Sequence, residues 1–225
     1  MTRPFAIITV GLVAATWGVY LLVQGVDLAW SFLGPFSAAV GVLTAAGFGF
    51  KHWAWHWPGL HLLTRVPRLS GSWAGTMQSN YVHAGESEPR GPIDVIVVIS
   101  QNADRITIRQ YTSESASITV ASSAYDEDGD RFVVATVYRN EPPVHLQQTR
   151  SPMHYGATRL AVEGPARHPR RLVGDYWTMR NTAGTLDLKF VSRRQVHSFR
   201  EGIEMHEALR SNKALQQSAG DAGRS

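Results

Sequence analysis

Aromatic, amide, hydroxyl and guanidinium side chains recur on segments of the second half of the chain that alternate like β-strands. A guanidinium binds a phosphate through paired hydrogen bonds, and a tyrosine ring offers a flat face on which a nucleobase stacks. These residue types predict a site for a phosphorylated aromatic ligand. The alternative is that the arginines lie outside the sheet, in water. The candidate ligand-binding residues are Thr76, Arg109, Tyr138, Asn140, His154, Arg159, Tyr176, Thr178 and Arg180.

Residues with the spacing needed for catalysis or metal binding are scarce. Asp126, Asp128 and Asp130 surround Gly129 as in part of a calcium loop, but the glutamate that closes such a loop is missing. No Gly-x-Ser-x-Gly elbow and no phosphate-cradling glycine loop occurs, and the chain has no cysteine. We therefore predict a protein that is not an enzyme and carries no metal or other cofactor.

The candidate residues lie on segments that alternate with a period of two and are separated by turn residues. Eight short strands without helical patterns between them predict an all-β, eight-stranded, antiparallel up-and-down barrel, with a sandwich as the alternative. The predicted strands are 71–79, 92–100, 105–112, 116–125, 131–139, 153–163, 171–180 and 185–193.

The interior of an eight-stranded barrel is filled by side chains or holds one small ligand. In the seventh strand Tyr176, Thr178 and Arg180 share one face, and Asp175, Trp177 and Met179 share the other. The lining of a lipid pocket would be uniformly apolar, and neither face of this strand is.

The first 50 residues contain two apolar runs, 5–26 and 28–50, each longer than the roughly 20 residues that an α-helix needs to cross a bilayer. They predict a transmembrane helical hairpin, and hence a membrane protein. Arg3 precedes the first run, Lys51 follows the second, and the loop between them carries only Asp27. The positive-inside rule then places both termini and the barrel in the cytosol.

Small residues recur at intervals of four in the second run, at Ser37, Gly41, Ala45 and Gly49. This ridge allows close approach of another helix, either the first helix of the hairpin or a second copy. We name Ser37, Gly41, Ala45 and Gly49 as candidates for oligomerisation in the membrane.

The resulting organisation has four parts: a hairpin over 1–50, a tryptophan-rich juxtamembrane connector over 51–68, the barrel over 69–194 and a tail over 195–225. In the tail we expect a short helix over 201–215, followed by a disordered end. The formal charge of +4 fits an anionic ligand or lipid surface, but the basic residues form no stripe of the kind that binds DNA or RNA.

The order of several motifs resembles one protein family. These motifs are the hairpin and tryptophan connector, Leu-Ser-Gly-Ser-Trp-Ala-Gly at 69–75, Gln101, the serine run at 112–117, Val-Tyr-Arg-Asn-Glu-Pro at 137–142, His-Tyr-Gly at 154–156 and Gly-Asp-Tyr-Trp-Thr-Met-Arg at 174–180. Together they resemble the two-transmembrane β-barrel effectors of bacterial CBASS anti-phage defence, which are associated with CD-NTase enzymes. The resemblance covers residues 2–194.

This resemblance implies a nucleotide receptor and a membrane-disrupting effector in one chain. A cognate CD-NTase would make a cyclic dinucleotide, which would bind the cytosolic barrel and drive homo-oligomerisation. The clustered hairpins would then disrupt the bacterial inner membrane and cause abortive infection. The Tyr-x-Thr-x-Arg and Tyr-x-Asn-x-Pro elements of the family match at 176–180 and 138–142, so Tyr176, Thr178, Arg180, Tyr138 and Asn140 are the implied ligand contacts.

Two other classes of function compete with this interpretation. A membrane-anchored carrier of lipids or hydrophobes predicts an apolar lumen with space in it. An assembly subunit predicts a filled barrel without a ligand pocket.

Overall fold

The computed structural model describes residues 3–23, 25, 33–54, 57, 66–82, 87–89, 91–102, 105–127, 131–147, 152–165 and 169–222. The chain divides into two compact units, one comprising Met1–Thr64 with Asn102–Asp104 and the other comprising Arg65–Gln101 with Arg105–Ser225. The tip of the predicted hairpin, 26–32, most of the predicted connector, 55–56 and 58–65, and residues 128–130 of the aspartate-rich turn lie outside the described residues.

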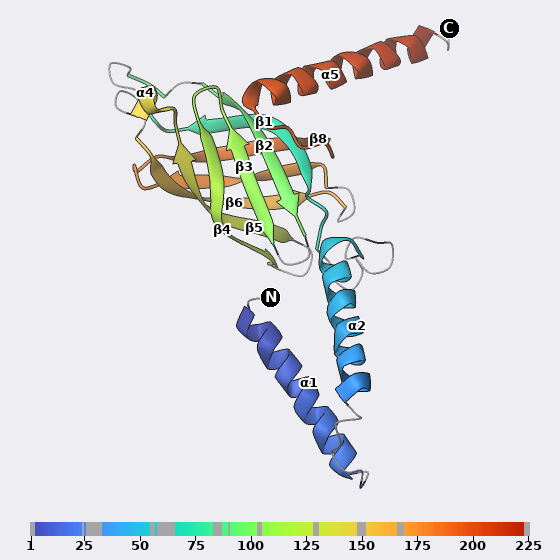
Figure 1. Ribbon diagram of the computed structural model, residues 1–225. Helices are drawn as coiled ribbons and strands as arrows, with labels where there is room; N and C mark the ends of the chain where they lie inside the picture. The colour runs from blue at the N-terminus through green and yellow to red at the C-terminus, as the bar shows by residue number, and fades with distance from the viewer. Residues whose placement is uncertain are drawn as a thin grey trace. The chain divides into compact units, whose positions relative to one another are not determined.

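The first unit contains two helices, α1 (Arg3–Val23) and α2 (Leu33–His52) (Figure 1). Their apolar residues favour long helices, and Pro4 and Pro35 lie in the first turns, where a missing N–H costs least. The predicted pair of helices is confirmed. Among the described residues, however, no helix combines the length and the apolar character needed to cross a membrane. The prediction that the pair spans a bilayer is therefore not supported.

The ridge of small residues in α2 is open. Ser37, Gly41 and Ala45 are exposed and Gly49 is half-buried. A methyl group added at Gly41 or Gly49 would meet no atom of the described structure within 4 Å. The described residues thus place no other helix on this ridge.

The second unit is a closed antiparallel barrel in which each strand pairs with the next and β8 pairs with β1 (Figure 1). The predicted barrel is confirmed, and the alternative of a sandwich is wrong. The strands are β1 (Gly71–Ser79), β2 (Ile93–Gln101), β3 (Ile106–Tyr111), β4 (Ala116–Asp126), β5 (Phe132–Glu141), β6 (His154–Glu163), β7 (Arg171–Thr178) and β8 (Ala183–Ser192).

One end of the barrel is filled with apolar side chains. Trp73 is fully buried there, packs edge-on against Phe190 at 5.2 Å between ring centroids, and donates its indole N–H to the Leu69 carbonyl at 3.0 Å. Gln101 fixes the chain as it enters the barrel, because its side chain accepts from Leu69 N at 2.7 Å and donates to the Pro67 carbonyl at 2.9 Å. We call this the closed end.

Three strand boundaries lie two residues from the predictions. The fifth strand ends at Glu141 instead of Arg139. The seventh strand ends at Thr178 instead of Arg180, and the eighth begins at Ala183 instead of Thr185. Asn181 has φ 57°, a left-handed conformation that asparagine tolerates better than most residues, so the chain already turns there. The short helix α4 (Val144–Gln147), which was not predicted, follows two prolines between β5 and β6.

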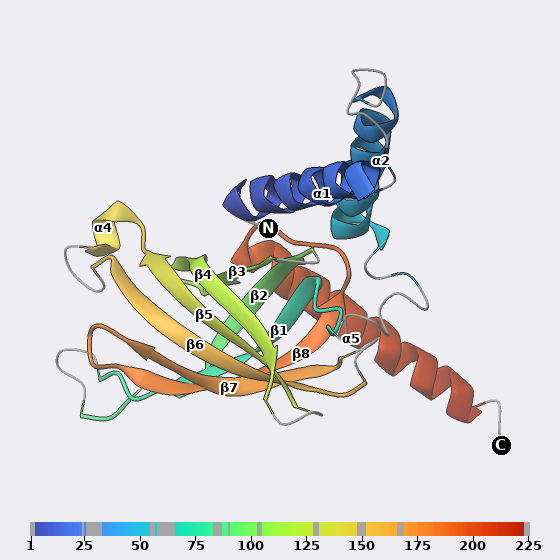
Figure 2. The same ribbon diagram turned by 90° about the horizontal axis from the view of Figure 1, so that it is seen from below.

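A long helix, α5 (Phe199–Ala222), follows the barrel. Ser198 begins it by accepting a hydrogen bond from Glu201 N at 3.2 Å. Its first turns cover β1 and β2, while its later turns extend beyond the strands (Figures 1 and 2). The prediction of a helix over 201–215 with a disordered end is wrong in extent, because the alanine, leucine and glutamine that follow residue 213 are good helix formers.

Candidate ligand-binding site

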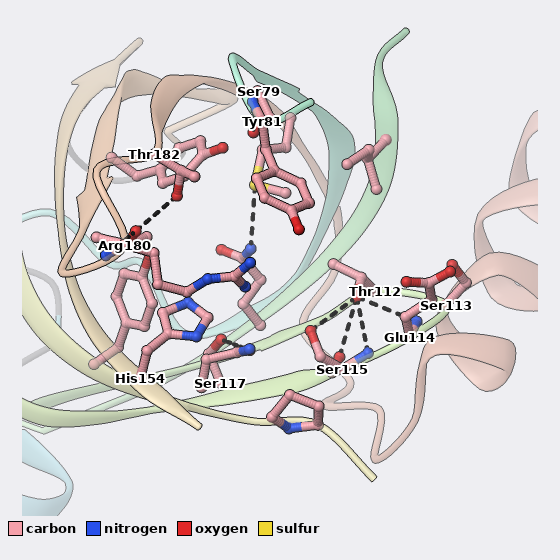
Figure 3. A pocket seen from close by; sticks show the side chains of 18 of the residues that line it. Ser79, Tyr81, Thr112, Ser113, Glu114, Ser115, Ser117, His154, Arg180 and Thr182 are labelled. Carbon is pink, nitrogen blue, oxygen red and sulfur yellow. Dashed lines mark hydrogen bonds between the residues drawn. The ribbon is translucent and has the colours of Figure 1, made fainter. Parts of the chain in front are cut away.

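A pocket of about 230 Å³ opens at the end of the barrel opposite Trp73 (Figure 3). We call this the open end. Described residues of the loops that join β1 to β2, β3 to β4, β5 to β6 and β7 to β8 contribute to its lining. The lining residues are Met77, Ser79, Tyr81, Ile93, Gln110, Thr112, Ser113, Glu114, Ser115, Ser117, Tyr138, Asn140, Pro142, Leu146, His154, Tyr176, Thr178, Arg180 and Thr182.

Two tyrosines of the pocket wall each face a glycine across the sheet. Tyr138 pairs with Gly156, and Tyr176 pairs with Gly184. A methyl group at Gly156 would lie 2.5 Å from the Tyr138 ring, and one at Gly184 would lie 2.8 Å from the Tyr176 ring. The rings therefore occupy space that only glycine leaves free.

Burial governs the protonation of these two tyrosines. Desolvation raises the pKa of Tyr138 well above its ordinary value, and the proximity of Tyr176 raises it further. Burial likewise raises the pKa of Tyr176, although a hydrogen bond with the Ser79 side chain opposes part of this effect. Both hydroxyls consequently remain neutral hydrogen-bonding groups at physiological pH.

The polar groups of the β4–β5 wall and of the β3–β4 turn are held by hydrogen bonds. Ser117 Oγ donates to Asn140 Oδ1 at 2.8 Å, and Asn140 is buried. In the turn, Thr112 Oγ1 accepts from Ser115 N at 3.0 Å. This bond orders the segment that presents Ser113 and Glu114 at the mouth of the pocket (Figure 3).

Arg180 reaches the pocket from the turn between β7 and β8 (Figure 3). The Thr178 and Thr182 hydroxyls lie 2.6 Å apart across this turn, and Thr178 Oγ1 accepts from Arg180 N at 3.1 Å. The Arg180 guanidinium lies over the Tyr81 ring, 4.8 Å from its centroid. Of the described residues, Arg180 is the one arginine that lines the pocket.

His154 completes this side of the pocket (Figure 3). Its Nδ1 lies 2.9 Å from the Pro152 carbonyl oxygen. A carbonyl only accepts, so Nδ1 donates, and Nε2 of the neutral ring is left as an acceptor.

Hydroxyl, amide, guanidinium and aromatic groups thus converge at the open end, whereas the apolar part of the lumen is packed. Below the pocket lies a second cavity of about 20 Å³, about the space of one water molecule. A lipid carrier requires a hollow apolar lumen, which this barrel lacks. The alternative of an assembly subunit predicts a barrel without a ligand pocket, whereas this barrel has one.

The structure brings together five of the eight residues on which the predicted site depended most. Tyr138, Asn140, Tyr176, Thr178 and Arg180 all line the pocket, as does the further candidate His154. Their role in binding stays a prediction.

Three candidates lie elsewhere, and the prediction that they share the site is wrong in geometry. Thr76 and Arg109 are exposed on the outer wall. Arg159 also points away from the pocket and forms an ion pair with Glu127. Each lies one residue from an inward position, so the alternation of the strand turns it outward.

Several lining residues were missed. Met77 and Gln110, the neighbours of Thr76 and Arg109, face the lumen, where Gln110 Nε2 lies 3.7 Å from Met77 Sδ. Trp73 and Ile108 are apolar and face inward. Residues two or four apart on a strand share a face, so these two positions predict that Met77 and Gln110 face inward as well. The serine run at 112–117 also contributes lining residues, and in the sequence only the family resemblance points to it.

The sequence model of a family described as "Cap15, cyclic dinucleotide receptor domain" matches residues 64–190. The match covers more than half of the chain and reaches from the segment before β1 into β8. No curated protein matches the sequence.

Proposed function

This chain belongs to the family of Cap15 cyclic dinucleotide receptor domains, and we propose that it binds its cyclic dinucleotide in the pocket at the open end of the barrel. The family supports the assignment as a CBASS effector, and it is a family of receptors rather than of catalysts. The expectation that the chain is a receptor agrees with that description.

The observation that carries the proposed site is that Arg180 lines the same pocket as the buried Tyr176 and the half-buried Tyr138. Arg180 is held over Tyr81, and Tyr138 and Tyr176 line the same pocket. A cyclic dinucleotide presents two phosphates and two bases, so its receptor needs a charged hydrogen-bond donor together with aromatic faces. We assign phosphate binding to Arg180, base stacking to the tyrosines, and hydrogen bonding to Asn140 and Thr178.

The chain offers a matched pair of arginines to test this assignment. We would titrate the purified full chain with cyclic di-AMP, cyclic di-GMP and cyclic GMP–AMP in a calorimeter, and repeat the titration with Arg180→Ala and Arg109→Ala. Loss of a charge-assisted hydrogen bond should weaken binding by about 10- to 100-fold in Arg180→Ala. Arg109→Ala, on the outer wall, should bind like the wild type.

Two results would contradict the assignment. Equal affinities of Arg180→Ala and the wild type would place the nucleotide elsewhere. Equal losses in Arg180→Ala and Arg109→Ala would point to a nonspecific effect of charge.

The effector half of the function is a separate proposal that rests on the sequence and the resemblance. We propose that a cognate CD-NTase supplies the nucleotide and that the bound chain forms homo-oligomers. Its apolar helices would then disrupt the bacterial inner membrane, with the barrel on the cytosolic side. The exposed ridge at Ser37, Gly41 and Ala45 supports helix association.

The ridge can be tested without disturbing the barrel. Gly41→Leu would remove the close approach of helices while leaving nucleotide affinity unchanged, and we expect it to abolish nucleotide-dependent uptake of propidium iodide by expressing cells. Val42→Leu, an exposed change one position along the helix, is the control. Uptake that persists in Gly41→Leu would rule out the ridge as the contact.

A further inference from the structure

Among the described residues, the outer wall of the barrel carries two apolar patches, one covered by α5 and one exposed. Ala74, Ile96 and Val98 of β1 and β2 are buried beneath α5 residues that include Phe199 and Ile203. A methyl group at Gly202 would lie 2.6 Å from Ile96, which shows how closely the helix approaches. The chain thus covers its first outer patch with its own helix.

The second patch lies across β4 to β8, and its large side chains are exposed. One register row joins Ala121 to Val137, Ala157, Trp177 and Ala183 on successive strands, so an apolar line runs around the wall. We call the large side chains on and beside this line the outer band. They are between 42% and 76% exposed, and they are Val120, Val137, Tyr155, Trp177 and Met179.

The outer band is the reverse side of the pocket wall. Trp177 lies between Tyr176 and Thr178 in the chain, and Tyr155 lies next to His154. Because successive residues of a strand point to opposite faces, a shift of these strands around a ligand moves the outer band as well.

Among the described residues, the charges that border the outer band include two ion pairs. Arg139 is bonded to Glu141, and Arg159 is bonded to Glu127. Asp175 stands directly opposite Arg159 in the register of β6 and β7. Two copies of this surface would therefore meet without a field of like charge, whereas an anionic membrane or a nucleic acid requires a positive one.

We infer that the outer band is the surface on which a second copy of this chain docks, through a two-fold contact centred on Trp177. An exposed tryptophan with a tyrosine and a methionine beside it is typical of the centre of a protein interface. A two-fold axis makes the same patch serve both partners, which agrees with its balanced charge. The inference rests on the proposed nucleotide-dependent assembly and adds the barrel surface that performs it.

Trp177→Glu tests the contact, with Leu209→Glu as its control. Leu209 is an exposed apolar residue of α5, so both changes place a carboxylate on the surface without touching the core. We would use the full chain in mild detergent with whichever of cyclic di-AMP, cyclic di-GMP or cyclic GMP–AMP binds most tightly. Calorimetry would report binding, and sedimentation velocity would report mass.

We expect the wild type and Leu209→Glu to assemble with nucleotide. Trp177→Glu should bind the nucleotide with unchanged affinity but self-associate at least about 10-fold more weakly. Normal assembly of Trp177→Glu would overturn the inference, as would nucleotide binding by the wild type without assembly. The receptor function would stand in both cases.

Cysteine cross-linking tests the surface directly, because the chain has no cysteine of its own. Ala157→Cys, in the middle of the apolar line, should give dimers with a short bismaleimide, and Leu209→Cys should not. If no nucleotide binds at all, the proposed function fails, and cross-linking of the chain alone then decides about the surface. Absence of Ala157→Cys dimers under both conditions would overturn the inference.

Discussion

The two ends of the barrel are built from the same eight strands but differ in the side chains at their inward positions. At the closed end Leu69, Trp73 and Leu188 are fully buried in one apolar cluster. At the open end the inward positions hold Tyr138 and Tyr176 opposite glycines, together with hydroxyl and amide groups, and a pocket remains. The difference indicates that the closed end stabilises the fold, while the open end is available for binding.

The largest effect should come from emptying the closed end. Trp73→Ala removes a fully buried side chain that packs on Phe190, so the free energy of unfolding should fall by about 3–5 kcal/mol. Trp177→Ala is the matched control: this tryptophan is half exposed on the outer wall, and its loss should cost less than about 1 kcal/mol. Urea unfolding followed by circular dichroism measures both values.

Equal losses of stability in the two tryptophan variants would contradict the stabilising role of the closed end. The separation of the two ends would likewise be contradicted if the folded fraction of Trp73→Ala, measured where the variant is still native, bound nucleotide much more weakly than the wild type. Either result would mean that the two ends do not divide stability and binding between them.

A smaller effect is expected from filling the space behind a pocket tyrosine. Gly156→Ala places a methyl group 2.5 Å from the Tyr138 ring and 2.8 Å from the Trp177 carbonyl oxygen, so the ring must move. We expect a loss of about 1–3 kcal/mol in unfolding free energy and a clear loss of nucleotide affinity. Gly91→Ala, where the added methyl group meets nothing within 4 Å, should change neither quantity.

Unchanged nucleotide affinity in Gly156→Ala would show that the position of the Tyr138 ring does not matter to the ligand. The open end would then bind through its polar rim alone.

The sequence was sufficient to predict the barrel because strands and turns have local signatures. Alternation with a period of two and turn residues such as those at 181–184 set most strand limits to within two residues. Helix α5 was underestimated, since the polar residues of its last turns resemble those of a disordered tail. The membrane-spanning role of α1 and α2 followed from apolar length alone, and the described structure does not support it.

The pocket was predicted only in part, because the candidates follow from residue type and not from which face of the strand each position occupies. Thr76 and Arg109 were chosen for their chemistry, although Trp73 and Ile108 on the same strands already fix the opposite face as inward. The pairing of Tyr138 with Gly156 depends on the register between two strands, which no single segment reveals. The sequence therefore predicts many of the side chains of the open end but not the cavity that they line.

The smallest effect concerns the Tyr138 hydroxyl and appears only in alkali. Burial raises the pKa of Tyr138, so above about pH 10 the unfolded chain loses this proton while the folded chain keeps it. The stability of the wild type is therefore unaffected by this group below pH 10 and should then fall by up to about 1.4 kcal/mol for each further pH unit. Tyr138→Phe has no such proton and should lose stability less steeply.

Urea unfolding of the wild type, Tyr138→Phe and Trp73→Ala between pH 8 and about 11 separates the two ends of the barrel. Trp73→Ala should lie below the wild type by a constant amount at every pH, because packing at the closed end involves no proton. Tyr138→Phe should approach the wild type or exceed it as the pH rises. Parallel curves for wild type and Tyr138→Phe would mean that water reaches the Tyr138 hydroxyl in the folded chain. The open end would then extend deeper into the barrel than the packing around Tyr138 indicates.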